Sequence, residues 1–543
     1  MASLNPRIPG HLIQLKAETS PDTVIFTFEG WTSGIADEVI TYSMLWEQSA
    51  KVAQELIAQG LQPRDTFAIF MRNHPEFVYA LLGGSISGCV FVPIDPRQKG
   101  EKLRYQLQHA ECKAVVTTTD LLPAVEAVLP QLPTMRVILA SQRPGGPPAA
   151  GSPPSGSRVR SYQEVLAQPL RATPEQRVSE LSHPIQVIYT SGTTGDPKGV
   201  VAETGRWSGT AGLVGGVFGY TKEDRLYTGL SLTHGNAQVV TFLAALYNDV
   251  PAVFSPRFSK SKIWDVCRRY GCTTFSLLGG MMAAIYAEPR RPDDGDNPVR
   301  FVLSAGTPRA IWEEFEKRFN TCILEWYGAV EGGFAFKPIG QGPIGSFGRP
   351  IPGVLEIKVV DDDDNECPPG VIGELISRAP GQETKVEYLK NPEASAAKTR
   401  GGWLRSGDMC HRDADGWLFF DYRKGSEIRH NGEFIQPDFV EKVIAELPEV
   451  TDVYVYGVPA KSGSPGERDV VAAIVLVDGV TFDAAKFFAA CAAQLERNQI
   501  PSYVQVLKEI PKTASEKPQN RFLIDDLVNR RCPVYEFDAA AER

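Results

Sequence analysis

The sequence predicts an α/β protein with a large N-terminal domain of parallel αβ sheets in several subdomains and a small α+β domain at the C-terminus. Apolar, strand-like runs alternate with helix-like segments through most of the chain, which is typical of parallel sheets covered by helices. At 543 residues, the chain is too long for a single hydrophobic core. The αβ pattern starts afresh near residue 426. We therefore expect one domain over residues 1–424 and a second over residues 425–543.

The first half of the chain carries the clearest alternation. A helix is predicted over residues 43–60, because Leu45, Val52 and Leu56 recur on one face and Gly60 is a stop signal. Further along we expect strands at residues 66–71 and 90–96, and helices at residues 75–83 and 101–109.

The second half continues the same pattern after an interruption. Residues 143–157 are rich in Pro, Gly, Ala and Ser, which predicts a mobile surface insertion and not a domain boundary. The acidic run at residues 361–365 is interpreted as a hairpin turn, in preference to a metal site. Strands are expected at residues 227–232, 251–254, 273–278, 301–304, 453–458 and 470–477, and a helix at residues 483–496.

Composition excludes several classes of protein. The formal charge of −9 argues against a general nucleic-acid binder. No apolar run approaches the length of a membrane span, and residues 1–20 lack a signal-peptide pattern. The nine cysteines are scattered and never spaced as C-x-x-C, which favours a reducing, cytoplasmic location over a disulfide framework or zinc site.

One stretch organises the rest of the chain. Residues 189–200 read YTSGTTGDPKGV and follow an apolar, strand-like run. Glycine-rich backbone, several hydroxyls and the cation of Lys198 together suit a polyphosphate. The stretch differs from the common phosphate loop because Pro197 precedes the lysine and does not allow a helix to start there. The alternative is a flexible surface turn.

This stretch resembles the signature of the adenylate-forming superfamily, which includes acyl-CoA synthetases, nonribosomal peptide adenylation domains and luciferases. Further motifs follow in the family's order over nearly the whole chain. The resemblance implies that ATP and a carboxylic acid form an acyl-adenylate and pyrophosphate, with Mg²⁺ as cofactor. The acyl group then passes to a thiol, that of coenzyme A (CoA) being favoured.

The second motif is WYGAVE at residues 326–331, which is similar to the family's Tyr-Gly-x-Thr-Glu. The resemblance implies that Glu331 helps to hold Mg²⁺ and that Tyr327 packs on the adenine, roles that suit a carboxylate and an aromatic ring. Val330 stands where the family usually has threonine, which removes a hydroxyl from the phosphate site.

Two more motifs resemble nucleotide contacts. The turn at residues 304–308 looks like the family's adenine-binding turn, and Asp408 in WLRSGD is placed to accept the ribose hydroxyls, with Arg423 near the same sugar or the phosphate. The complete set implied for the nucleotide is Thr190, Ser191, Gly192, Thr193, Thr194, Gly195, Lys198, Gly306, Thr307, Pro308, Glu325, Trp326, Tyr327, Gly328, Ala329, Val330, Asp408 and Arg423, with Glu331 on the metal.

Two residues are expected to be catalytic. Lys517, in PKTASEK, matches the catalytic lysine of the family's last motif, although Glu516 stands where glycine is commoner. A cation there would stabilise the charge that develops in adenylation. Lys512 lies close by, but Lys517 keeps the family spacing. His234 matches a histidine beside the carboxylate site, and a satisfied buried histidine is the alternative.

A hinge is expected at Gly425, where the family usually has aspartate or lysine. The resemblance implies that the C-terminal domain is a mobile lid that takes one pose for adenylation and another for thiol transfer; glycine permits such a pivot. The alternatives are an adenylating enzyme that loads a carrier protein and a nucleotide-binding protein without turnover. The oligomeric state stays open, with a homodimer as one form.

The acid is constrained only loosely. Acetate-using members resemble one another in placing tryptophan where this chain has Gly328, so we expect an acid pocket that is open beyond two carbons. Gly279 and Gly280 precede two methionines in a loop that resembles a pocket-lining segment. Residues 234–238 and 516–519 look most like carnitine- and crotonobetaine-CoA ligases. A trimethylammonium acid would need aromatic faces, for which Trp207, Trp326 and Phe334 are available.

Overall fold

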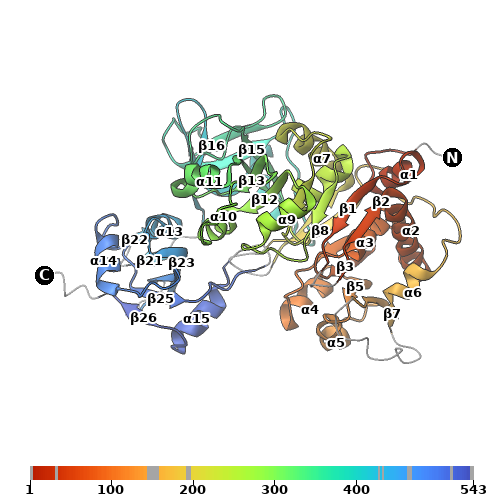
Figure 1. The fold of residues 1–543 in the computed structure, drawn as a ribbon, viewed down its shortest axis with the longest axis horizontal. Helices are drawn as coiled ribbons and strands as arrows, with labels where there is room; N and C mark the ends of the chain where they lie inside the picture. Colours follow the sequence, from red (N-terminus) through yellow and green to blue (C-terminus); the bar gives the residue numbers. More distant parts are fainter. Residues whose placement is uncertain are drawn as a thin grey trace. The chain divides into compact units, whose positions relative to one another are not determined.

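The computed structural model, drawn in Figure 1, describes residues 4–30, 35–143, 158–190, 197–425, 428–430, 433–461, 468–513 and 518–537. The chain forms two compact units. The first contains Met1–Ser276, Asn297–Val302 and Lys385–Ala397, and the second contains Leu277–Asp296, Leu303–Thr384 and Lys398–Arg543. The predicted boundary between residues 424 and 425 falls inside the second unit and stays a prediction.

Helices and strands alternate through the first unit. Those that begin in it are α1 (Pro9–Thr19), β1 (Val24–Phe28), β2 (Glu38–Thr41), α2 (Tyr42–Ala58), β3 (Thr66–Phe70), α3 (Pro75–Ser87), β4 (Val90–Pro93), α4 (Gly100–His109), β5 (Ala114–Thr118), α5 (Leu122–Val128), η1 (Leu129–Gln131), β6 (Val137–Ser141), β7 (Val159–Ser161), α6 (Tyr162–Ala167), β8 (Pro184–Tyr189), β9 (Gly199–Glu203), α7 (Thr204–Phe218), β10 (Leu226–Thr228), η2 (Ala237–Leu243), α8 (Ala244–Asn248), β11 (Ala252–Phe254), α9 (Ile263–Tyr270), β12 (Thr274–Leu278), β13 (Phe301–Ala305), β18 (Glu387–Tyr388) and α12 (Pro392–Lys398).

The main sheet of this unit has eight strands in the order β18-β9-β8-β4-β3-β5-β6-β7. Strands β4, β3, β5, β6 and β7 pair in parallel, and β9 pairs antiparallel to β8. The central strands read as unbroken apolar runs because helices cover both faces; Val92, Val115 and Ile138 are almost fully buried with Leu103 and Leu107 of α4. The α/β class is therefore confirmed, with mixed sheets where parallel ones were expected.

Among the described residues, the second unit carries two four-stranded sheets, a two-stranded sheet and part of a second eight-stranded sheet. Its elements are α10 (Gly279–Tyr286), η3 (Arg309–Ile311), α11 (Trp312–Phe319), β14 (Cys322–Ala329), β15 (Gly332–Lys337), β16 (Glu356–Val360), β17 (Gly373–Arg378), η4 (Arg400–Gly402), β19 (Leu404–Arg412), β20 (Leu418–Arg423), β21 (Ile428–His430), β22 (Glu433–Ile435), α13 (Pro437–Ala445), β23 (Val450–Pro459), β24 (Arg468–Leu476), α14 (Ala484–Ala492), β25 (Tyr503–Leu507), α15 (Asn520–Val528) and β26 (Val534–Glu536).

The C-terminal sheet has the order β23-β24-β25-β26 and is buried on both faces. Successive side chains of β24 point to opposite faces, so Ala472 and Ile474 join the core under α13 and α14, and Val471 and Ala473 join the core under α15. The blue part of Figure 1 shows these elements together. They form the small α+β domain that the sequence predicts.

Most predicted elements are found, with adjusted ends. Helix α2 replaces the prediction at 43–60 almost residue for residue, and α3 runs on to Ser87. The strand expected over residues 227–232 stops at Thr228, because the backbone N–H of Leu230 donates to the Thr228 hydroxyl and that of Leu232 donates to Asn73. Of the insertion predicted at 143–157, residues 144–157 lie outside the described part.

One predicted loop is wrong. Residues 279–282 were expected in a loop, but Gly279 is the first residue of helix α10, and Met281 and Met282 are buried in that helix. The close approach of neighbouring backbone explains the glycine, since a Cβ on residue 279 would lie 1.8 Å from the carbonyl oxygen of Gly306. The acidic run at 361–365 does lie in the turn of a hairpin, that of β16 and β17.

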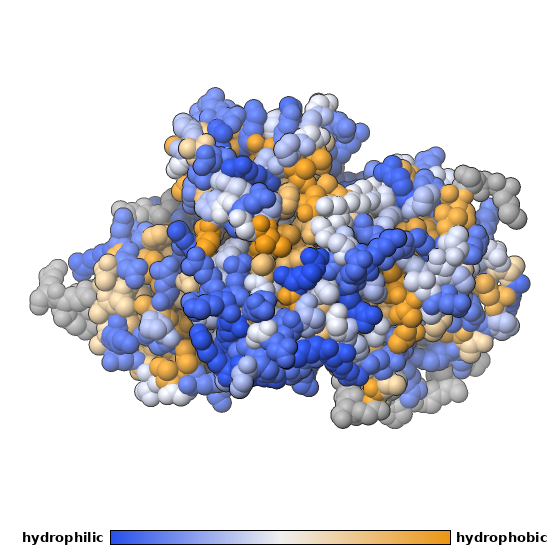
Figure 2. Space-filling view, turned by 45° about the horizontal axis from the view of Figure 1, so that its top comes forward, coloured by the Kyte–Doolittle hydropathy of each residue, from blue (hydrophilic) through white to orange (hydrophobic). Residues whose placement is uncertain are grey.

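The face drawn in Figure 2 is mostly polar. Figure 2 shows hydrophilic side chains over much of the visible face, with apolar residues in smaller groups among them. Among the described residues, none of the helices combines the length and the apolar character that crossing a bilayer requires.

Candidate functional site

In the first unit, the glycine-rich loop is carried by a hairpin. Strands β8 and β9 pair antiparallel up to Tyr189 and Gly199, and the Thr190 backbone N–H donates to the Lys198 carbonyl at 2.9 Å. The exposed Lys198 places its ammonium 5.5 Å from the centre of the Tyr388 ring. The loop therefore leaves a strand and returns into a strand, as the proline before the lysine requires. Ser191, Gly192, Thr193, Thr194 and Gly195 lie outside the described residues.

His234 stands before the π-helix η2 in the same unit. Its Nδ1 accepts the backbone N–H of Asn236 at 3.3 Å, so in the neutral ring the proton is on Nε2. The side chain of Asn236 is buried, and neither its amide nitrogen nor its amide oxygen has a partner in the described structure. A π-helical turn is unusual and is frequent at functional sites.

A chain of buried amides fixes η2 against β8. Gln186 donates to Gln238 at 2.7 Å and accepts the indole N–H of Trp207 at 3.2 Å. Gln238 also donates to the Leu232 carbonyl. Trp207 is 4% exposed, so it belongs to the core.

In the second unit, Glu325 closes the turn that was compared with an adenine-binding turn. Its buried carboxylate accepts the backbone N–H groups of Gly306 at 2.6 Å and Thr307 at 3.2 Å, together with the Thr307 hydroxyl. Burial raises the pKa of Glu325 to about 7, and the hydrogen bonds from Thr307 and Gly306 oppose that rise. Gly306 has φ +82°, which suits glycine, and Pro308 follows as the residue before η3.

Asp408 joins two of the predicted motifs. Its buried carboxylate accepts the Tyr327 hydroxyl at 2.5 Å and an Nη1–H of Arg423 at 2.7 Å. The Tyr327 ring packs 4.9 Å from that of Phe347, at the edge of a small core that includes Leu375 and Cys410. Burial, with the Asp408 charge next, raises the pKa of Tyr327 far above its ordinary value, so the phenol stays a donor.

Glu331 faces a lysine that the sequence analysis did not single out. The ammonium of Lys398 lies 4.0 Å from a carboxylate oxygen of Glu331 and donates to the Ser406 carbonyl at 3.1 Å. Both side chains are largely buried. Burial lowers the pKa of Lys398, and the neighbouring charges of Glu331 and Asp408 oppose that change. A lysine in an alanine-rich helix gives no sequence signal for such a place.

An aromatic pair from the neighbouring strands β14 and β15 lies beside Gly328. Trp326 and Phe334 stack with ring centres 6.2 Å apart, and Gly328 pairs with Phe334 across the strands. A Cβ on residue 328 would lie 3.0 Å from the Trp326 ring. Gly328 and Ala329 are exposed, and Val330 is half-buried.

A second buried lysine supports the same strand. Lys337 lies opposite Glu325 in the β14–β15 register, and its ammonium stands 4.7 Å from the centre of the Trp312 ring. Burial lowers the pKa of Lys337, whereas Glu316 and Glu325 act to raise it. Pairing a buried cation with a buried acid limits the cost of burying either alone.

Lys517 lies outside the described residues, but the base of its loop is defined. Lys512 bridges to Pro518, and the Gln519 backbone N–H donates to the Pro511 carbonyl at 2.8 Å. The ammonium of Lys512 forms an ion pair with Asp452 and is 17% exposed. The ammonium of Lys512 is therefore already paired with an acid.

Gly425, the expected hinge, has φ +84°, and a Cβ there would meet nothing within 4 Å. Its neighbour Lys424 is fixed on both sides. The Lys424 backbone N–H donates to the Gly407 carbonyl at 2.8 Å, and its ammonium bonds Asp362 at 2.9 Å. The backbone at residue 425 therefore takes a conformation that few residues other than glycine adopt.

These groups suit a nucleotide chemically. A carboxylate beside a tyrosine and an arginine can take hydroxyls, and Glu331 can give one oxygen to Mg²⁺. Mg²⁺ usually takes one or two protein carboxylates and completes its shell with phosphates and water, so a single acidic residue fits. Among the described residues, no group of three or more acidic, histidine or cysteine side chains forms a metal cluster.

Two family models match the chain. The model of AMP-binding enzymes matches residues 13–384, and that of the AMP-binding enzyme C-terminal domain matches residues 440–517. The medium/long-chain-fatty-acid–CoA ligase FadD17 of Mycobacterium tuberculosis is 32% identical over 475 residues, covering 86% of this chain and 88% of that protein. The crotonobetaine/carnitine–CoA ligase of Salmonella typhimurium is 26% identical and covers 88% of this chain and 91% of its own.

Solved structures share the fold. The anthranilate CoA ligase AuaEII in complex with anthranoyl-AMP superposes with a TM-score of 0.81 at 22% identity, covering 96% of this chain and 97% of that chain.

Proposed function

The chain belongs to the family of AMP-binding enzymes, and on that premise we propose that it joins a carboxylic acid to CoA in two steps. In the first, a carboxylate oxygen attacks the α-phosphorus of ATP, and the bond to pyrophosphate breaks. In the second, the CoA sulfur attacks the acyl carbon, the thiol proton leaves, and AMP departs with the electron pair of the carbon–oxygen bond. The relatives that carry the name CoA ligase support this reading over a carrier-protein partner.

The observation that carries the proposal is the cluster around Asp408. Tyr327 and Arg423 hold its carboxylate at 2.5 and 2.7 Å, and Lys398 connects the same motif to Glu331. A preorganised acid of this kind can accept the two ribose hydroxyls without rearranging.

The roles of single residues follow from this arrangement. Glu331 would hold Mg²⁺, which supplies charge stabilisation for the phosphates when it is bound. Lys517 would bring a cation to the α-phosphate during adenylation, and Lys198 would face the leaving pyrophosphate from the loop. His234, whose Nδ1 is occupied by the Asn236 N–H, would offer an Nε2–H to the acid's carboxylate.

The acid is proposed to be larger than acetate. Gly328 adds no side chain beside the Trp326–Phe334 pair, and a Cβ there would already lie 3.0 Å from the Trp326 ring. A trimethylammonium acid is the leading specific candidate, because the faces of stacked aromatic rings attract a cation. A medium-chain fatty acid is the second candidate, favoured by the 32% identity to the mycobacterial ligase.

Two assays test the proposal. The purified protein with ATP, Mg²⁺ and a panel of acids (acetate, butyrate, hexanoate, benzoate, crotonobetaine and carnitine) should catalyse exchange between ATP and labelled pyrophosphate. With CoA added, and no carrier protein present, it should release AMP. No exchange with acids of any size would favour a nucleotide-binding protein without turnover, and exchange without CoA-dependent AMP release would favour a carrier protein.

A further inference from the structure

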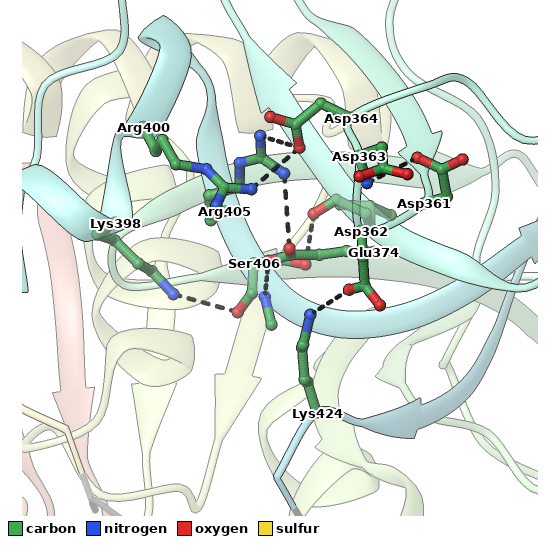
Figure 3. Close-up of polar contacts among 12 residues, drawn as sticks. Asp361, Asp362, Asp363, Asp364, Glu374, Lys398, Arg400, Arg405, Ser406 and Lys424 are labelled. Atoms are coloured by element: carbon green, nitrogen blue, oxygen red, sulfur yellow. Dashed lines mark hydrogen bonds and ion pairs between the residues drawn. The ribbon is translucent and has the colours of Figure 1, made fainter.

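Lys398 touches both nucleotide motifs of the second unit. Its ammonium lies 4.0 Å from Glu331 and 3.1 Å from the Ser406 carbonyl, two residues before Asp408. Figure 3 shows the side chain extended toward Ser406. An ammonium has three N–H donors, and in the described structure the Ser406 carbonyl takes one of them at hydrogen-bond distance. Donors remain for another acceptor.

The other cations near this motif are already committed to acids. Arg400 and Arg405 both contact Asp364, and Lys424 contacts Asp362 at 2.9 Å. In Figure 3 the acidic run of residues 361–364 lies against these three cations, on the far side of Ser406 from Lys398. Arg423 is bonded to Asp408. Lys398 differs from these cations because its acid partner, Glu331, lies at 4.0 Å, beyond hydrogen-bond distance.

The order in which the groups of ATP are joined indicates what the remaining N–H donors of Lys398 could bind. The α-phosphate connects the ribose to the β- and γ-phosphates that carry the metal. If Asp408 takes the ribose and Glu331 the metal, the α-phosphate must lie along the path that joins these two acids. Lys398 contacts the motif of one and the carboxylate of the other. Val330 offers no hydroxyl to this phosphate, so a cation here would supply the missing contact.

We propose that Lys398 binds the α-phosphate of the nucleotide, through its ammonium, in the ATP, acyl-adenylate and AMP states alike. The inference rests on the proposed function, because it takes Asp408 and Glu331 as the ribose and metal ligands. It assigns to the lysine at the end of α12 a lasting contact with the α-phosphate, in addition to the contact proposed for Lys517 during adenylation.

The test compares two ligands that differ by this one phosphate. AMP and adenosine are titrated in EDTA, so that no metal contributes, and their dissociation constants are measured by calorimetry. Lys398→Gln should weaken AMP roughly 10- to 100-fold, the worth of a charge-assisted hydrogen bond, and leave adenosine unchanged. Lys398→Arg should restore most of the AMP affinity. Lys317→Gln, an exposed lysine of α11, is the matched control and should change neither constant.

A purely structural lysine would give different results. Equal losses for AMP and adenosine, or an unchanged AMP constant, would overturn the inference. If Lys398 served only to hold Glu331, its substitution would lose its effect on AMP in a Glu331→Gln background, whereas a phosphate contact keeps it there. A failure of this inference can be distinguished from a failure of the proposed function, because pyrophosphate exchange by the wild-type protein tests that function without any variant at residue 398.

Discussion

The phenol of Tyr327 donates to the carboxylate of Asp408, 81 residues further along the chain, at 2.5 Å. This bond ties β14 to β19 within the second unit. It also means that the ribose would meet a carboxylate whose oxygens already hold donors. Each carboxylate oxygen has two acceptor sites, so the sugar hydroxyls share the acid with the tyrosine and the arginine.

Removing that phenol should cost stability and nucleotide affinity together. Tyr327→Phe leaves the ring against Phe347 but deprives a buried acid of one donor. We expect the free energy of unfolding to fall by about 1–3 kcal/mol, measured by urea denaturation, and ATP to bind more weakly. Tyr247→Phe, which loses a hydrogen bond to Arg7 at the surface, should change the unfolding free energy by less than about 0.5 kcal/mol. Equal effects of the two substitutions would contradict the account.

Glu325 should make the stability depend on pH. Its pKa is raised in the folded protein, from 4.5 to about 7, so the folded state binds more protons than the unfolded state between these values. The contribution of this group to the free energy of unfolding should therefore be highest below pH 4.5 and be lost as the pH rises through about 7, by roughly 3 kcal/mol.

The corresponding variant is Glu325→Gln, which cannot titrate. Denaturation at several pH values between 4.5 and 8 should show a flatter profile for this variant than for the wild type. Glu356→Gln, at a half-exposed carboxylate that pairs with Arg378, is the control and should leave the slope as it is. A slope that survives in Glu325→Gln would assign the pH dependence to another group.

Lys517→Ala should separate the two half-reactions. A lost cation contact at the α-phosphate costs on the order of 10²–10³ in the rate of adenylation, by analogy with oxyanion donors. Transfer from a supplied acyl-adenylate to CoA should be largely spared, because the lid is expected to withdraw the lysine for that step. Lys512→Ala, which breaks the ion pair with Asp452, should not reproduce this split. Similar losses in both steps would rule out a two-pose lid.

Gly425→Pro should impair thiol transfer more than adenylation. Proline fixes φ near −65°, whereas the observed φ is +84°, so the chain can no longer adopt this conformation or rotate at this position. Gly425→Asn is the control, since asparagine tolerates the left-handed region and keeps a rotatable backbone. Single-turnover rates of each step provide the measurement. If proline left both rates intact, the pivot would have to lie elsewhere.

Gly328→Trp should shorten the acids that the enzyme accepts without weakening ATP. The new side chain would start 3.0 Å from the Trp326 ring and fill the space beside it. We expect kcat/KM for hexanoate and benzoate to fall relative to that for acetate, and the KM for ATP to stay unchanged. Acetate as the best substrate of the wild type would refute an open pocket. A clear optimum away from carnitine and crotonobetaine would refute only the trimethylammonium candidate.

Local sequence was sufficient to predict most of the helices and strands. The spacing of Leu45, Val52 and Leu56 predicted α2, and Pro197 correctly indicated that no helix starts after the glycine-rich loop. What periodicity does not contain is the approach of distant segments. The start of α10 depends on the backbone at Gly306, and the end of β10 depends on Asn73; neither neighbour is visible in the local pattern.

The candidate site shows the same limit more sharply. Motif matching located Glu331 and Asp408 but could not say that a lysine stands against one of them. Lys398 is the last residue of a polar, alanine-rich helix, α12. Its importance becomes visible only in the folded chain, where this lysine lies against two motifs. Likewise, the burial that raises the pKa of Glu325 is a property of the packed unit, which no single stretch encodes.

The near-contact of Gly279 with Gly306 has a consequence for anyone who redesigns this protein. The carbonyl of residue 306 occupies the space that a side chain on residue 279 would need. The start of α10 therefore packs directly against the turn that Glu325 holds. Mutations at residue 279 would therefore shift the turn as well, and if that turn binds adenine as proposed, they would weaken ATP binding together with any change in acid selectivity. Library design should leave Gly279 unchanged and vary the exposed end of β14 at residues 328 and 329 instead.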